Sequence, residues 1–125
     1  MTQKKYPTIL EQEVGEGTAS ADVVVYLMKT DDDLMYFDGH FDQAAILPGV
    51  VQLDWAVFYG KNNLHVSGDF SGMEAVKFQN VIKAGQQFNL ELKYDRDKQK
   101  LHFKYFSDAG PHSSGRIIFS TAEDT

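Results

Sequence analysis

The sequence predicts an α+β fold in which one long central helix is wrapped by a mainly antiparallel sheet. One long apolar segment, from Pro48 to about Leu64, indicates the helix. Stretches of alternating apolar and polar residues separated by short polar turns follow it, which is the pattern of an antiparallel sheet. The chain has 125 residues, a length that fits one domain, so we predict a single domain over 1–125.

The first strand is predicted at 21–29, before the helix. This run is rich in valine and indicates a strand buried on both faces. Three consecutive aspartates at 31–33 end it. No further ligand cluster accompanies them, so we interpret them as a solvated turn rather than a metal site.

The helix is predicted to begin at Pro48, because proline is favoured at the first helical position, where its missing N–H has no intrahelical acceptor. The apolar residues that follow leave no wide polar face, which is typical of a helix buried on all sides. Gly60 and the polar residues behind it indicate where the helix ends.

Four strands are predicted after the helix. Residues 73–83 alternate in character, and the stretches 88–94 and 101–105 alternate across a polar turn, as in an antiparallel hairpin. A loop rich in glycine and proline is predicted at 108–114, and a last short strand at 116–121.

Composition excludes several classes of function. The chain has no cysteine, which excludes disulfide and thiolate chemistry and suits a cytoplasmic protein. Its net charge is −6 and its lysines are scattered, so nucleic acid is not an expected partner. No signal peptide is recognisable, and no stretch approaches the ~20 apolar residues of a membrane span.

Three residues around the predicted helix start carry the chemistry. His40 follows Gly39 in a loop or strand end, where an imidazole can exchange protons near neutral pH. Asp54 falls on an apolar helical stripe with Val50 and neighbouring residues, where desolvation would raise its pKa and let it donate a proton. Gly49 offers a backbone N–H at the positive end of the helix dipole.

Each residue also has a plainer interpretation. His40 could be an incidental loop histidine, Asp54 a buried carboxylate satisfied by nearby donors, and Gly49 only a helix-start glycine. Together, however, they could abstract a proton next to a carbonyl, stabilise an enolate-like oxygen and protonate a leaving group. That combination predicts a β-elimination.

These residues resemble a known family. Phe37-Asp38-Gly39-His40-Phe41, then Leu47-Pro48-Gly49 and Leu53-Asp54, is similar to the 3-hydroxyacyl-(acyl-carrier-protein) dehydratases, which have the hotdog fold. Val76-Lys77-Phe78, Val81-Ile82, Gly85 and Phe88 match a second segment of that family. The sequence from Pro48 to Trp55 is most similar to that of the small dehydratases of aryl-polyene-type clusters.

The resemblance implies a hydro-lyase that converts 3-hydroxyacyl thioesters to trans-2-enoyl thioesters in fatty-acid or polyene lipid biosynthesis. His40 would abstract the C2 proton, Asp54 would protonate the departing 3-hydroxyl, and the Gly49 N–H would hold the thioester oxygen. The site loop and tunnel would be formed by Phe37, Gly39, Phe41, Pro48, Val50 and Phe58.

The resemblance also implies partners. Each site would be built across a homodimer, or across a heteromer with a related hotdog subunit, and the substrate would arrive on the phosphopantetheine of an acyl carrier protein. No cofactor and no metal are expected. Lys61, Lys77 and Lys83 are candidates for docking an acidic carrier, although solvated surface lysines are the plainer interpretation.

Two alternatives stay open at this point. A hotdog acyl thioesterase would use a helix-borne carboxylate to direct water onto the carbonyl. A non-catalytic acyl-carrier-binding hotdog subunit would pair with an active homologue. The remaining histidines, His65, His102 and His112, show no ligand spacing and are predicted to be surface groups.

Overall fold

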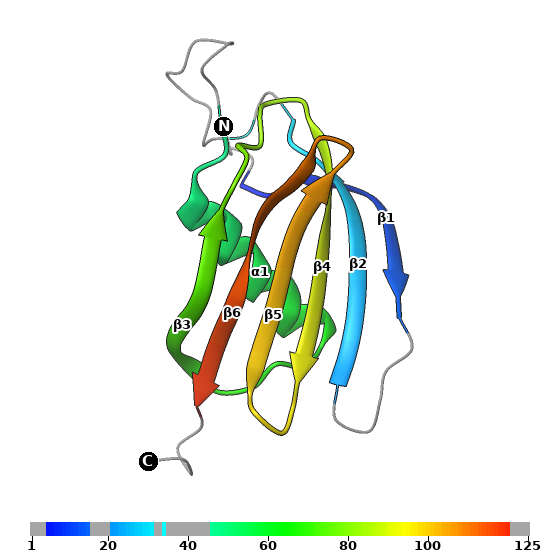
Figure 1. Ribbon diagram of the computed structural model, residues 1–125. Coiled ribbons are helices and arrows are strands. Elements are labelled where there is room, and N and C mark those ends of the chain that lie inside the picture. Colours follow the sequence, from blue (N-terminus) through cyan, green and yellow to red (C-terminus); the bar gives the residue numbers. More distant parts are fainter. Residues whose placement is uncertain (1–4, 16–20, 32–33, 35–45, 121–125) are drawn as a thin grey trace.

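The described part of the protein forms one antiparallel sheet with a helix packed against it. The computed structural model describes residues 5–15, 21–31, 34 and 46–120. Its elements, in chain order, are β1 (Thr8–Val14), β2 (Ala21–Lys29), α1 (Gly49–Asn63), β3 (Asp69–Phe78), β4 (Gln87–Asp95), β5 (Lys100–Ser107) and β6 (Gly110–Ser120). The sheet has the strand order β1-β2-β4-β5-β6-β3, so β1 and β3 are its edges (Figure 1).

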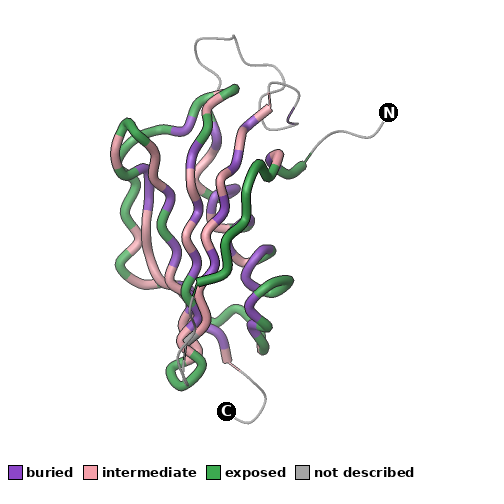
Figure 2. Tube along the Cα trace, turned by 90° about the vertical axis from the view of Figure 1, so that its right-hand side faces the viewer, coloured by how far each residue is buried: buried purple, intermediate pink, exposed green. Residues whose placement is uncertain are grey.

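The core lies between the inner face of the sheet and one side of α1. It contains buried apolar side chains from β2, β4, β5 and β6, which face Val51, Trp55, Ala56 and Tyr59 of the helix. The opposite side of α1 is exposed along its length (Figure 2). The predicted helix is therefore present, but it has 15 residues and the sheet covers only one side of it. The prediction of a helix buried on all sides is wrong for the single chain.

Strand β2 is buried on one face rather than two. Val24, Tyr26 and Met28 are fully buried, whereas the residues between them are half-buried. The valines on the outer face are partly covered by their neighbours in the sheet, and among the described residues no second layer packs there. The prediction of burial on both faces is corrected accordingly.

The predicted hairpin is confirmed as β4 and β5, which pair from Asn89↔Phe106 to Asp95↔Lys100. The predicted loop at 108–114, by contrast, is mostly strand, because β6 begins at Gly110. The register shifts between Tyr105 and Phe106 because β6 has one extra residue there, a bulge at His112 next to Pro111. A bulge tolerates proline within a sheet, so the Gly/Pro content indicated a loop where the chain forms an irregular strand.

The edge strand β3 contains two irregularities, between Phe70 and Gly72 and between Glu74 and Lys77. Each adds one residue relative to β6, and Ala75 in the second has a φ of 54°. Because an extra residue shifts the alternation of side chains by one, Met73 faces α1 and Glu74 faces outward. The predicted strand at 73–83 thus begins earlier, at Asp69, and ends at Phe78.

Strand β1 was not predicted. It is an edge strand whose sequence is dominated by polar residues, and all but one of its residues are exposed. It has little of the alternation that identifies a half-buried strand.

No helix in the described ranges is long and apolar enough to span a membrane.

Candidate active site

The structure describes one half of the predicted catalytic set. Phe37, Gly39, His40 and Phe41 lie outside the described residues. Gly49, Val50, Asp54 and Phe58 are all on α1, and Pro48 immediately precedes it. The site can therefore be built here from the helix and from the strands beside it.

The helix begins one residue later than predicted. Pro48 is the N-cap, with extended backbone angles (φ −60°, ψ 147°) and no side-chain capping bond, and Gly49 is the first helical residue. The first N–H groups of a helix have no intrahelical acceptor and lie at the positive end of its dipole. The Gly49 N–H is one of these groups, and its role as an oxyanion donor stays a prediction.

A hollow of about 290 Å³ lies at this helix start. It is lined by Ile46, Leu47, Pro48, Gly49, Gln52, Phe78, Gln79, Asn80 and Val81. The ring of Phe78 packs directly on Gly49, because a Cβ at position 49 would lie 2.8 Å from the Cε1 and Cζ atoms of that ring. A side chain at position 49 would therefore require the Phe78 ring, which is 54% exposed, to shift.

A second, mainly apolar hollow of about 330 Å³ contains Asp54. Its lining residues are Val50, Leu53, Asp54, Val57, Phe70, Met73 and Ile117. The Asp54 carboxylate therefore lies on the apolar helical stripe that the sequence predicts. It faces Met73, which the irregularity in β3 turns toward α1.

Asp54 is nevertheless exposed in the single chain. The apolar side chains around it are also open, with Val50 72%, Phe70 56% and Met73 50% exposed. The predicted desolvation of Asp54 is consequently not provided by this chain alone. The physical reason is that the chain's own sheet covers the opposite side of α1.

Phe58 lies one turn after Asp54 but packs elsewhere. Its ring stacks on Tyr6, with centroids 4.3 Å apart, and meets Tyr59 edge-on at 5.1 Å. The indole N–H of Trp55 donates to the carbonyl of Lys5 at 3.0 Å, so the segment before β1 is bound along the helix. The role of Phe58 in a substrate tunnel stays a prediction.

A buried polar side chain, Gln52, supports the helix start and was missed by the sequence analysis. It is only 3% exposed. Its amide donates to the carbonyl of Leu47 at 3.3 Å and accepts from the hydroxyl of Ser113 at 2.6 Å. Its backbone carbonyl accepts from the hydroxyl of Tyr105 at 2.7 Å. A lone amide within the apolar Val51–Leu53 stretch was the signal available in the sequence.

Tyr105, which donates to the Gln52 carbonyl, is fully buried. Burial is the main reason that the pKa of Tyr105 lies well above its ordinary value, with smaller contributions from Tyr59 and Asp54. Burial likewise raises the pKa of Tyr59 to about 12. The Tyr105 hydroxyl therefore stays protonated and donates its hydrogen bond to the Gln52 carbonyl.

His112 was predicted to be a surface group and is instead 1% exposed. Its Nε2 lies 2.7 Å from the Ser107 hydroxyl and its Nδ1 lies 3.3 Å from the Asn80 carbonyl. The His112 carbonyl accepts from the N–H of Gln79 at 2.9 Å. The bulge in β6 turns this side chain inward, where it fixes the segment that follows Phe78 and borders the Gly49 hollow.

Comparison with known proteins places this geometry in a family. A family model described as ApeI-like, ApeI dehydratase, matches residues 16–116. The chain belongs to the ApeI-like dehydratase family. The predicted hotdog dehydratase family, including its aryl-polyene branch, is thereby confirmed.

Solved structures agree with this assignment. An uncharacterized protein from Erwinia carotovora subsp. atroseptica is similar at 33% identity and a TM-score of 0.83, covering 94% of this chain and 98% of the other. A chain of the dehydratase heterocomplex ApeI:P from Xenorhabdus doucetiae is similar at 31% identity and a TM-score of 0.78, covering 90% and 96%. Both likenesses extend over nearly the whole of either chain.

Curated relatives point to the same chemistry. The 3-hydroxyacyl-[acyl-carrier-protein] dehydratase FabZ of Oceanobacillus iheyensis is 28% identical over 75% of this chain and 71% of its own length. FabZ of Ruminiclostridium cellulolyticum is 31% identical over 70% of this chain and 66% of its own length. With the family match, these relatives support dehydration of 3-hydroxyacyl thioesters as the function of the family.

Proposed function

We propose that this chain is a hydro-lyase that dehydrates 3-hydroxyacyl thioesters to trans-2-enoyl thioesters in fatty-acid or polyene lipid biosynthesis. The observation that carries the proposal is the placement of Asp54 and Gly49 on one helix. Asp54 lies in an open apolar hollow, five residues beyond the uncapped Gly49. Five residues correspond to about 7.5 Å along the helix axis. The same five residues also turn the helix by about 140°, so Gly49 and Asp54 open into the two separate hollows described above.

In the proposed reaction, the imidazole of His40 takes the proton from C2 of the substrate. The electrons of that C–H bond form the C2=C3 double bond while the C3–O bond breaks. Protonated Asp54 gives its proton to the departing hydroxyl, which leaves as water. Negative charge that develops on the thioester oxygen is stabilised by the Gly49 N–H, a donor oriented before the reaction begins.

A second subunit completes the site in this proposal. Asp54 needs an apolar cover to be held protonated near neutral pH, and the single chain leaves its surroundings open. A second subunit over this face would bury the exposed Val50, Phe70 and Met73 and bring its own His40 to Asp54. That subunit is a second copy of this chain or a related hotdog subunit, as the dehydratase heterocomplex of the Xenorhabdus relative suggests.

The remaining parts of the proposal concern delivery of the substrate. An acyl carrier protein presents the 3-hydroxyacyl group on its phosphopantetheine, and the chemistry needs no cofactor or metal because acid, base and N–H donor suffice. Pro48 and Val50, together with Phe37, Gly39, Phe41 and Phe58, form the loop and tunnel around the acyl chain. A cytoplasmic location stays a prediction.

The test is turnover of 3-hydroxyacyl-carrier substrates of graded chain length, followed by mass spectrometry for the loss of water. General acid–base groups typically contribute about 10²–10⁴-fold to a rate. His40→Ala and Asp54→Asn should each lose at least about 10²-fold in kcat while the protein stays folded and assembled. Asp97→Asn, an exposed turn residue, is the matched control and should leave kcat unchanged.

The same assay separates the alternatives. Release of free carrier thiol without an enoyl product would identify a thioesterase. If the purified protein turns over no acyl thioester until a second hotdog subunit is added, and Asp54→Asn still supports that activity, the chain is a non-catalytic subunit. Wild-type dehydration rates in both the His40→Ala and Asp54→Asn variants would overturn the proposed mechanism.

A further inference from the structure

The outer face of the sheet carries a basic hollow that the proposed reaction does not use. The hollow has a volume of about 430 Å³. Its lining residues are Ala75, Lys77, Glu91, Lys93, His102, Phe103, Lys104, Ser114, Gly115 and Arg116. Four of these side chains are cationic and one is anionic, which gives +4 − 1 = +3 with His102 neutral. The whole chain has a net charge of −6, so the rest of it carries −9.

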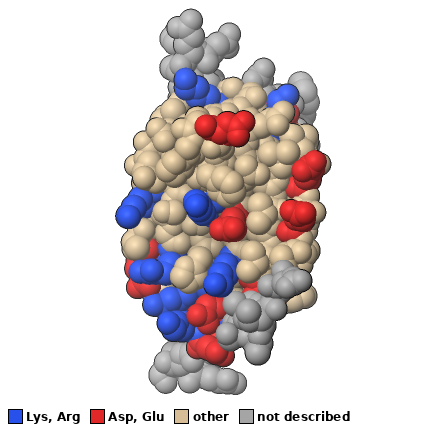
Figure 3. All heavy atoms as spheres, turned by 45° about the vertical axis from the view of Figure 1, so that its right-hand side comes forward, with Lys and Arg blue, Asp and Glu red and all other residues tan. Residues whose placement is uncertain are grey.

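Strand register explains why these distant residues meet. One row across the sheet pairs Lys77 with Ser114, Ser114 with Lys104, and Lys104 with Glu91. The neighbouring row pairs Arg116 with His102 and His102 with Lys93. Residues two apart on a strand share a face, so both rows point outward. Basic side chains lie in the middle and along the left of this face, and acidic ones lie beside them in the middle, at the top, in the lower part and along the right border (Figure 3).

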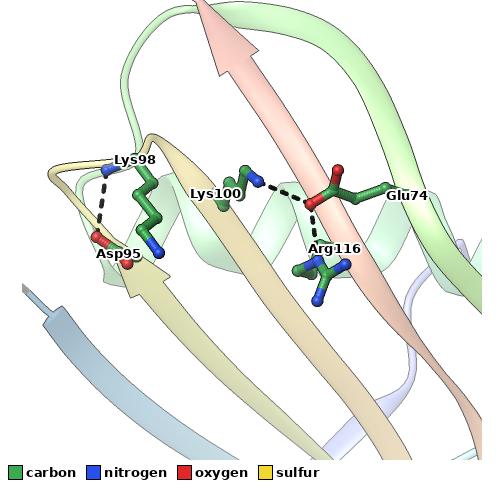
Figure 4. A network of polar contacts seen from close by, with 5 residues as sticks. All are labelled: Glu74, Asp95, Lys98, Lys100 and Arg116. Carbon is green, nitrogen blue, oxygen red and sulfur yellow. Dashed lines mark hydrogen bonds and ion pairs between the residues drawn. The ribbon is translucent and has the colours of Figure 1, made fainter.

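Part of the basic hollow is held in place by Glu74, which the irregular β3 turns outward. Its Oε1 accepts from Lys100 Nζ and from Arg116 Nε, both at 2.8 Å (Figure 4). Hydrogen bonding from Lys100 is the main reason that the pKa of Glu74 is lowered, and Arg116 adds to it. Around the hydrogen-bonded side chains of Glu74, Lys100 and Arg116, three lysines are exposed: Lys77, Lys93 and Lys104.

The pKa of His102, in the middle of the second row, reflects the electrostatic potential in the hollow. Partial burial is the main reason that its pKa is lowered, and the positive charges of Arg116 and Lys93 lower it further. An imidazolium is disfavoured where neighbouring cations dominate. The sign of the field in the hollow thus agrees with the count of charges around it.

The basic hollow is separated from the proposed active site only by the edge strand β3. Lys77 lines the hollow on the outer face, and the next residue, Phe78, packs its ring on Gly49 on the inner face. The lining strands β3, β6, β5 and β4 are neighbours about 4.8 Å apart, so the far side of the hollow is about 14 Å from the edge. A protein bound over the hollow could pass a flexible arm around β3 to the helix start.

We infer that this basic hollow is the surface on which the acyl carrier protein docks, with its acidic side against Lys77, Lys93 and Lys104. The inference rests on the proposed function, since it assumes a carrier-bound substrate. Carrier proteins are acidic, and so is this chain, so association requires a local region of opposite charge. The structure supplies one where the sequence showed only scattered lysines; of the three sequence candidates it retains Lys77.

The experiment compares two charge-reversal variants of the full chain that have the same net charge. The test variant combines Lys93→Glu with Lys104→Glu, and the control combines Lys5→Glu with Lys98→Glu, at exposed positions before β1 and in the β4–β5 turn. Each substitution changes the charge by −2, so both variants go from −6 to −10. Each is assayed with a 3-hydroxyacyl-carrier protein and with the same acyl group on free pantetheine.

We expect the test variant to lose about tenfold or more in kcat/KM for the carrier-bound substrate at low salt, mainly through KM, because charge attraction accelerates association by about 10–10³-fold. It should keep pantetheine turnover within about twofold of wild type, because the reacting groups are untouched. The control variant should lose no more than about threefold with either substrate. Added salt should reduce the difference between the two variants.

A binding titration with fluorescent carrier protein reads docking without turnover. If the wild-type protein dehydrates neither substrate but the test variant alone loses carrier binding, the proposed function fails and the docking surface stands. If pantetheine turnover is intact and both variants bind and process the carrier alike, the docking surface is wrong and the proposed function stands. A loss of pantetheine turnover confined to the test variant would also contradict the inference.

Discussion

Gln52 is a buried polar residue that fixes the position of a group on another residue, the Gly49 N–H. Its amide joins the Leu47 carbonyl, just before the helix, to the Ser113 hydroxyl of β6. The helix start, and with it the Gly49 N–H, is thereby tied to the sheet. A buried amide without partners is costly, and in Gln52 both the amide nitrogen and the amide oxygen are hydrogen-bonded.

We predict that Gln52→Met, which nearly conserves volume, destabilises the protein by about 1–3 kcal/mol, because the Ser113 hydroxyl is left buried without an acceptor. Ser113→Ala in the same background should recover about 1 kcal/mol or more of that loss. Urea denaturation of the two single variants and the double variant measures the coupling. Strictly additive losses would show that the two side chains do not support one another.

At the same scale, sequence and structure disagree most where burial depends on distant residues. The spacing placed Asp54 on an apolar stripe, and the hollow around it has that lining. Its exposure could not be predicted, because nothing in the stripe reveals which side of the helix the chain's own sheet covers. His112 shows the reverse error: it was predicted to be a surface group because it has no ligand spacing, and a bulge in β6 turns it into the core.

Among the elements, regular alternation was the reliable signal. The β4–β5 hairpin followed its pattern because each strand has one face against the core, whereas the apolar helix, predicted to be buried on all sides, has one side exposed. Strand β1 escaped detection because an acidic, exposed edge strand has no apolar face to reveal it. Strand β3 was only partly predicted, because its extra residues break the alternation at Ser71 and Ala75.

The close approach of β3 to β6 at its second irregularity can be tested with two glycines. A Cβ at Gly115 would lie 2.9 Å from Phe103 Cε2 and 3.1 Å from the Cα of Val76, whereas a Cβ at Gly72 would meet nothing within 4 Å. Gly115→Ala should therefore cost about 1–3 kcal/mol of stability, because the backbone of β3 must move. Gly72→Ala should be neutral or stabilising by up to about 1 kcal/mol. Equal thermal stabilities of the two variants would contradict this packing.

At the scale of the whole molecule, one side of α1 is left uncovered by the chain's own sheet. Val50 is 72% exposed beside Asp54, and Val14, on the far edge strand, is 74% exposed. Both are exposed valines in the single chain, but only Val50 lies on the face where the proposed second subunit packs. The two positions form a matched pair for testing that proposal.

We expect Val50→Glu to weaken assembly, because a buried unpaired carboxylate at an interface is costly, and to shift the protein toward monomer at micromolar concentration. Val14→Glu should assemble as the wild type does. Analytical ultracentrifugation over a dilution series measures both. Unchanged assembly of Val50→Glu would place the subunit contact elsewhere.

In the proposed assembly, each active site combines His40 of one subunit with Asp54 of another. Mixing the inactive His40→Ala and Asp54→Asn proteins under conditions that exchange subunits tests it most directly. In a symmetric dimer, half of the mixed population is heterodimer, and each heterodimer has one intact site, so dehydration should return to about a quarter of the wild-type rate. If verified exchange restores no activity, the two residues do not act across a subunit boundary, and the account is wrong.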